Sequence, residues 1–135
     1  MAGYSKKSLV DKLGIKAGHR ICLLNAPKNY VDTLGQLPPD VGVEQNPVAG
    51  LDFLQFFTKR RTQLEAQFPM LKQTIAQNGM LWISWPKKAS KIETDVTGSV
   101  VREIGLANGL VDVKVCAVDQ VWSGLKFVYR VKDRK

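Results

Sequence analysis

Short apolar runs typical of buried strands alternate along the chain with segments whose apolar residues recur at helical spacing. The unbroken run Ile21-Cys22-Leu23-Leu24 is typical of a strand that is covered on both faces. Between residues 59 and 77, in contrast, apolar side chains recur every three or four residues, which places them on one face of a helix. This alternation predicts an α/β fold in which helices cover both faces of a mostly parallel sheet.

The same patterns place each element in the sequence. Strands are expected over residues 19–25, 41–44, 51–57, 80–85, 110–118 and 121–131. Helices are expected over residues 30–37, 59–77 and 95–107, with a short first helix that Ser5 caps and Gly14 ends. Pro69 predicts a kink or a new start inside the longest helix, and Thr94 with Asp95 is expected to cap the last one.

The last two strands determine how the sheet ends. Only Asp119-Gln120 separates them, which is too short for a parallel crossover, so they form an antiparallel hairpin. We therefore expect a three-layer, Rossmann-like sheet of about six strands in one domain over residues 1–135, the general layout of class I methyltransferases. On that analogy the strand order is 2-1-3-4-6-5. The six-residue link over 45–50 leaves little room for a crossover, so a hairpin between the second and third strands is the alternative.

Charge and composition narrow the class of protein. The chain of 135 residues has 20 Lys and Arg against 12 Asp and Glu, a net charge of +8. No apolar run approaches the length of about 20 residues that a membrane helix needs, and the first residues lack the apolar stretch of a secretory signal. We therefore expect a basic cytoplasmic protein with two reduced cysteines and no membrane partner. Its oligomeric state stays open.

The carboxyl ends of the strands are the expected ligand site, because ligands of open α/β sheets bind there beside helix amino termini. Six basic residues follow strands at this edge, so we expect an anionic small molecule as the ligand. Basic side chains would supply charge, and the others would shape the pocket. The alternative is that the loop lysines are only solvated. The candidate ligand-binding residues are Asn25, Lys28, Tyr30, Lys59, Arg60, Trp85, Lys87, Lys88, Lys91, Trp122 and Ser123.

Two further hypotheses use the same edge. The second is a nucleic-acid-binding protein that adds the basic tail over residues 126–135. The third is a divergent S-adenosylmethionine-dependent methyltransferase in which Glu44 holds the ribose. Against the third, the turn over residues 25–30 contains no glycine, and Pro27 removes one amide donor. We therefore expect no cofactor.

Few residues can do chemistry. His19 is the only histidine and is expected at the opposite end of the first strand, on the surface. Cys22 and Cys116 are expected in the middle of distant strands as buried thiols, and Asp119 as a turn residue. With no catalytic or metal-binding set, a non-catalytic binding module is favoured over an enzyme.

Three stretches carry a resemblance to a known family. They are LWISWPKKASKIETD over residues 81–95, GLVDVKVCAVDQVWSGLKFV over 109–128 and LVDKLGIKAGHRICLLNAP over 9–27. The chain resembles a family of short bacterial proteins known as a domain of unknown function. The resemblance covers nearly the whole chain and implies a bacterial cytoplasmic protein with a degenerate, methyltransferase-related Rossmann-like fold. It implies no ligand and no site residue.

Overall fold

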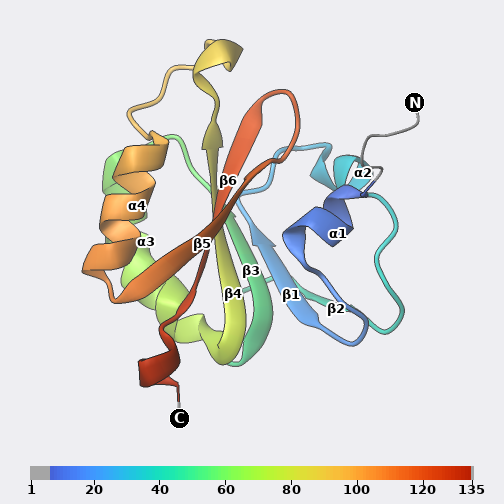
Figure 1. The fold of residues 1–135 in the computed structure, drawn as a ribbon. Helices are drawn as coiled ribbons and strands as arrows, with labels where there is room; N and C mark the ends of the chain where they lie inside the picture. The colour runs from blue at the N-terminus through green and yellow to red at the C-terminus, as the bar shows by residue number, and fades with distance from the viewer. Residues whose placement is uncertain (1–6, 135) are drawn as a thin grey trace.

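A six-stranded sheet lies between two layers of helices in the computed structural model, which describes residues 7–134 (Figure 1). The strands are β1 (Arg20–Leu24), β2 (Gly42–Glu44), β3 (Leu51–Phe57), β4 (Ile75–Pro86), β5 (Leu110–Ala117) and β6 (Trp122–Tyr129). The helices are α1 (Leu9–Leu13), α2 (Tyr30–Leu34), α3 (Arg61–Thr74) and α4 (Gly98–Ala107), with single 3₁₀ turns at Lys88–Ser90 and Val131–Asp133.

The strand order is β2-β1-β3-β4-β6-β5, as expected. Strands β2, β1, β3 and β4 run parallel, whereas β6 is antiparallel to both β4 and β5. The predicted Rossmann-like sheet with a closing antiparallel hairpin is therefore confirmed.

The link between β2 and β3 crosses β1 without forming a hairpin, so the alternative for these strands is wrong. Strand β1 separates them, and Glu44 lies level with Cys22 and hence with Leu54 of β3. Strand β3 begins at Leu51, three residues before Leu54. The link therefore has to run back along the strand direction by only about 10 Å, at roughly 3.3 Å per residue. Val48 of this link packs against the core on the α3 side of the sheet.

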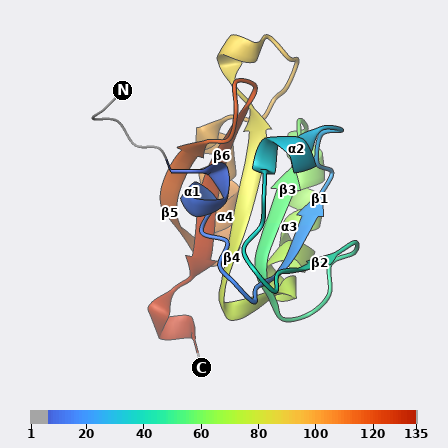
Figure 2. The ribbon, with the colours of Figure 1, turned by 90° about the vertical axis from the view of Figure 1, so that its right-hand side faces the viewer.

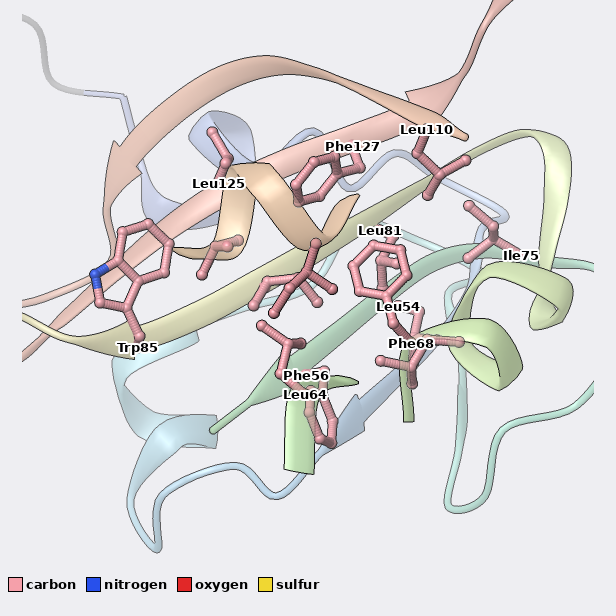
Figure 3. Close-up of a cluster of buried hydrophobic side chains, with 14 of the residues drawn as sticks. Leu54, Phe56, Leu64, Phe68, Ile75, Leu81, Trp85, Leu110, Leu125 and Phe127 are labelled. Carbon is pink, nitrogen blue, oxygen red and sulfur yellow. The ribbon is translucent and has the colours of Figure 1, made fainter. Parts of the chain in front are cut away.

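Helices α3 and α4 cover one face of the sheet and enclose the larger core (Figure 3). Leu64 and Phe68 of α3 pack onto Leu54 and Leu81 of the central strands. Phe68 also meets Phe127 of β6 edge to face, with ring centroids 5.7 Å apart. Aromatic pairs of this geometry add stability beyond the burial of their area, and this pair joins α3 to the antiparallel part of the sheet.

Helices α1 and α2 cover the opposite face (Figure 2). Trp82 of β4 is fully buried there, and its indole Nε1–H donates to the backbone oxygen of Leu13 at 2.9 Å. This bond satisfies a carbonyl at the end of α1, where the helix itself supplies no partner.

Three helices differ in detail from the expectation. Ser8 caps α1 by accepting from the amide of Asp11, whereas Ser5 lies outside the described residues. Helix α3 is one element with Pro69 inside it, so the alternative of a new helix that starts at Pro69 is wrong. Helix α4 begins at Gly98, where Thr97 accepts from the amide of Val100.

Strand β4 begins five residues earlier than expected, at Ile75. Ile75 continues the helical apolar spacing of the preceding segment, but it pairs with Leu51 of β3. The extra residues form an irregularity in the ladder before Met80 pairs with Phe53. Gly79 sits at this irregularity, where a Cβ would lie 2.6 Å from the backbone oxygen of Leu51.

Between residues 7 and 134, every helix is too short or too polar to cross a bilayer.

Candidate functional site

The carboxyl ends of β1 and β3 and the turn between β5 and β6 meet at one edge of the sheet, at the top of Figure 1. A pocket of about 460 Å³ opens between them. We call it the Asn25–Trp122 pocket, and its lining residues are Asn25, Pro27, Phe57, Thr58, Lys59, Gln63 and Trp122. Three of the predicted ligand-binding residues, Asn25, Lys59 and Trp122, are thus brought together.

Asn25 follows β1 directly and turns the chain into the pocket wall. Its φ of 58° lies in the left-handed region, which asparagine adopts more readily than other residues with a Cβ. The amide of Tyr30 then bonds the oxygen of Pro27 at 3.0 Å as α2 begins. A left-handed position that glycine often fills is occupied here by a residue with a polar side chain.

Three aromatic rings form one wall of the pocket and the layer beneath it. Phe57 meets Tyr30 edge to face at 4.8 Å between ring centroids, and it meets Trp122 in the same way at 5.2 Å. Tyr30 and Phe57 are buried, whereas Trp122 is half-buried. Asp119 Oδ1 accepts from the amides of Val121 and Trp122, each at 2.8 Å, and so orders the hairpin tip. The expected turn role of Asp119 is confirmed.

A buried polar chain lies beneath these rings. Tyr30 Oη donates to Gln55 Oε1 at 2.7 Å, and Gln55 Nε2 donates to Ser84 Oγ at 3.0 Å. Burial raises the pKa of Tyr30, so the phenol stays neutral and remains a donor. The chain ties α2 to the two central strands. Tyr30 therefore supports the pocket from below instead of lining it.

Polar groups at the start of α3 form another wall. Thr58 Oγ1 donates to Gln63 Oε1 at 2.6 Å and accepts from the amide of Arg60 at 3.2 Å. Lys59 is exposed and lines both this pocket and a neighbouring one. It is the cation of the Asn25–Trp122 pocket.

The amino terminus of α3 is already occupied by a carboxylate of the chain. Asp95 Oδ1 accepts from the amide of Arg61 at 2.7 Å, and Thr94 Oγ1 donates to the oxygen of Lys59 at 2.7 Å. Asp95 thus caps α3, and the expectation that it caps the following helix is wrong. The neighbouring pocket, of about 300 Å³, is lined by Lys59, Arg60, Glu93, Thr94 and Asp95. Its basic groups face acidic ones, which weakens its attraction for an anion.

The other predicted ligand-binding residues do not reach the Asn25–Trp122 pocket. Trp85 and Lys88 line a separate depression of about 390 Å³ in front of α4. The amide of Lys87 donates to the oxygen of Val121 at 2.7 Å, so its backbone joins β4 to the hairpin. Lys28, Lys91 and Ser123 line none of the pockets described for residues 7–134. Whether any of these residues binds a ligand stays a prediction.

Phe57 and Gln63 were missed by sequence reasoning. Phe57 is the last residue of β3, so it shares the edge with the loop residues that follow it. Gln63 lies in the first turn of α3 and faces the same edge. The position of each at an element end was the available signal.

Glu44 lies away from this pocket. It forms an ion pair with Arg20, with Nε and Oε2 3.5 Å apart. It is also level with Cys22, two residues before the end of β1. Glu44 lines none of the five pockets described among residues 7–134. Whether Glu44 holds a ribose stays a prediction.

The remaining candidate residues have structural surroundings. His19 Nδ1 accepts from the amide of Lys16 at 3.0 Å. Cys22 and Cys116 are free and buried, on strands four positions apart, and burial raises the pKa of both thiols. Over residues 7–134 no three His, Cys, Asp or Glu side chains gather in a way that could hold a metal ion.

Known proteins match this chain through structure rather than sequence. No family model matches, so the resemblance to a family of short bacterial proteins stays a prediction. No curated protein matches by sequence. Solved structures do match. A TehB-like SAM-dependent methyltransferase from Corynebacterium glutamicum aligns with a TM-score of 0.58 at 12% identity over 96% of this chain and 91% of that chain.

Two further matches are of the same kind. A SAM-dependent methyltransferase from Aquifex aeolicus aligns with a TM-score of 0.59 at 16% identity over 88% of this chain and 86% of its own. DhpI in complex with SAH aligns with a TM-score of 0.63 at 12% identity, over 91% of this chain and 83% of its own. At these identities the likeness establishes architecture and not activity. The chain has the Rossmann-like fold that these SAM-dependent methyltransferases share.

Proposed function

We propose that this chain is a divergent protein of the methyltransferase fold that binds S-adenosylmethionine, or its product S-adenosylhomocysteine (SAH), in the Asn25–Trp122 pocket. The observation that carries the proposal is the position of this pocket. It lies at the carboxyl ends of β1 and β3, where open α/β sheets bind their ligands. Matched structures include a methyltransferase described with bound SAH and the same protein with bound SAM.

The pocket residues fit the chemistry of such a ligand. Trp122, which is held from beneath by the buried Phe57, offers aromatic surface for the adenine ring, and an aromatic face also attracts a sulfonium cation. The ammonium of Lys59 suits the carboxylate of the methionine part. Asn25 adds an amide that both donates and accepts hydrogen bonds. The volume of about 460 Å³ lies within the range of small-molecule sites.

The pocket also departs from a glycine-rich cofactor loop. Pro27 removes a backbone donor from the first turn, and Glu44 is paired with Arg20 away from the pocket. A ligand held mainly by Trp122 and Lys59 should therefore bind with modest affinity, because fewer hydrogen bonds fix its ribose.

Bound S-adenosylmethionine would supply an electrophilic methyl group. The side chains of the pocket would bind this ligand and orient it. Lys59 supplies positive charge, and the hydroxyl of Thr58 is already committed to Gln63. Neither side chain is placed as a general base, so a methyl acceptor in this pocket would need a nucleophile that reacts without one.

Isothermal titration calorimetry tests the proposal with S-adenosylmethionine, SAH, ATP and inorganic phosphate as ligands. We expect binding of S-adenosylmethionine or SAH that is lost in Trp122→Ala and weakened in Lys59→Gln. Glu44→Gln is the matched control and should bind like the wild type. Binding of ATP or phosphate alone would overturn the proposal and favour the module for an anionic small molecule. Loss of binding in Glu44→Gln would overturn the placement of the ligand.

A further inference from the structure

Four lysines gather beside α1 on one face of the sheet, outside the Asn25–Trp122 pocket. Lys114 of β5 donates from Nζ to the backbone oxygen of Lys12 at 2.8 Å. Lys126 of β6 is the direct cross-strand partner of Lys114. A Cβ at Gly14 would lie 3.9 Å from the Nζ of Lys126, so this ammonium sits at the end of α1, two residues before Lys16. We call Lys12, Lys16, Lys114 and Lys126 the lysine face (Figure 2 shows α1 beside β5 and β6).

The lysine face lacks acidic partners. Like charges directly opposite each other on neighbouring strands destabilise a sheet, and Lys114 and Lys126 are such a pair. Among residues 7–134, none of the ion pairs within 4 Å includes any of the four lysines. The fold therefore retains a concentration of positive charge that its own side chains do not neutralise.

Lys126 is the residue with the least structural explanation. Lys114 satisfies a carbonyl at the end of α1, which gives it a role in the fold. Lys126 is partly buried, and no described residue accepts a hydrogen bond from its Nζ or pairs with it. Burial first, and then the charges of Lys114 and Lys16, lower its pKa. An unfavourable local arrangement that the fold does not need is typical of a functional surface.

The shape of the surface selects the class of ligand. None of the four lysines lines a pocket among those described, so nothing encloses a small molecule there. Lysines spread over a helix and two strands suit an extended polyanion. Trp82 of β4 is the cross-strand partner of Lys126 on its other side. It is fully buried under α1 and offers no ring for a base to stack on. The contacts available are therefore with phosphates, which carry no sequence information.

We infer that the lysine face is a second binding surface, which holds the phosphate backbone of a nucleic acid without reading its sequence. It is separate from the proposed S-adenosylmethionine site. If four phosphates are contacted, the logarithm of the binding constant should fall with the logarithm of salt concentration with a slope of about −3.6. That slope corresponds to a loss of affinity of roughly 150-fold between about 50 and 200 mM salt.

Fluorescence anisotropy of a short labelled DNA duplex over a series of KCl concentrations tests this inference. The variant with Lys114→Gln and Lys126→Gln should bind more weakly, and its salt slope should be smaller by about 2. Lys132→Gln, in the 3₁₀ turn near the carboxyl terminus, is the control for lost charge and should change the slope little. Circular dichroism checks that each variant is folded.

Three outcomes would overturn the inference. They are no binding of the duplex at about 50 mM salt, an equal loss of slope in Lys132→Gln, and binding of anionic lipid vesicles without binding of the duplex. S-adenosylmethionine titrated into the Lys114/Lys126 variant distinguishes the two proposals. Its binding should be unchanged there, whereas Trp122→Ala should lose S-adenosylmethionine and keep the duplex.

Discussion

Substituting Tyr30 by Phe should destabilise the protein by about 1–3 kcal/mol, although it removes only one oxygen atom. The lost hydroxyl donates to Gln55 Oε1 at 2.7 Å, and Gln55 is fully buried. In the variant, Gln55 Oε1 would remain buried away from water but would have lost its hydrogen-bond donor, so its desolvation would no longer be compensated. The other end of Gln55 is held by Ser84, so the amide cannot turn without breaking that bond as well.

Urea unfolding of Tyr30→Phe and the wild type measures this effect. A loss of 2 kcal/mol corresponds to a midpoint shift of roughly 1 M at an m-value of about 2 kcal/mol/M. Adding Gln55→Met and Ser84→Ala in the Tyr30→Phe background should recover much of the loss, because all three members of the buried polar chain are then gone. A loss below about 0.5 kcal/mol in Tyr30→Phe, or no recovery in the triple variant, would refute the argument.

The pH dependence of stability gives an independent check of the same residue. Burial raises the pKa of Tyr30 in the folded state. The stability that the neutral phenol contributes is therefore complete below the unfolded pKa of about 10 and is lost as pH rises above it. Unfolding free energies measured between about pH 8 and 11 should fall less steeply in Tyr30→Phe than in the wild type.

Two other substitutions test the packing and the capping. Gly105→Ala should destabilise by about 1–3 kcal/mol despite the better helix propensity of alanine, because its Cβ would overlap the ring of Phe127. An unchanged thermal midpoint would contradict this packing. Asp95→Ala should lower the unfolding free energy by about 0.5–2 kcal/mol, because the amide of Arg61 loses its cap. Glu93→Ala, which caps nothing, is its control and should have a smaller effect.

The sequence predicted the architecture because each strong signal is local. Strand β3 has the expected bounds, and the short link around Asp119-Gln120 indicated the hairpin, although the strands end one residue earlier and begin one residue later than expected. The junction at Ile75 was missed because this residue fits two patterns at once, the helical face of the preceding segment and a strand. Only its pairing with Leu51, a contact between distant residues, decides between them.

The site was predictable where it depends on strand ends and unpredictable where loops fold back. Asn25 and Lys59 follow parallel strands directly, so the topology brings them together. Asp95 caps a helix that begins 34 residues earlier in the chain, and no local pattern indicates such a contact. Of the lysine face, only Lys126 belongs to the predicted basic tail. The other three lysines were missed for the same reason, since Lys114 and Lys12 are 102 residues apart and meet only in the folded sheet.

The indole signals in a ¹H–¹⁵N correlation spectrum test the central claim most directly. Each of the three tryptophans has a different environment. Trp122 lines the Asn25–Trp122 pocket, Trp85 lines the depression before α4, and Trp82 is buried under α1. On titration with SAH, the account predicts that the indole signal of Trp122 shifts while those of Trp82 and Trp85 stay in place. A spectrum in which Trp122 does not move, or in which Trp85 moves alone, would contradict it.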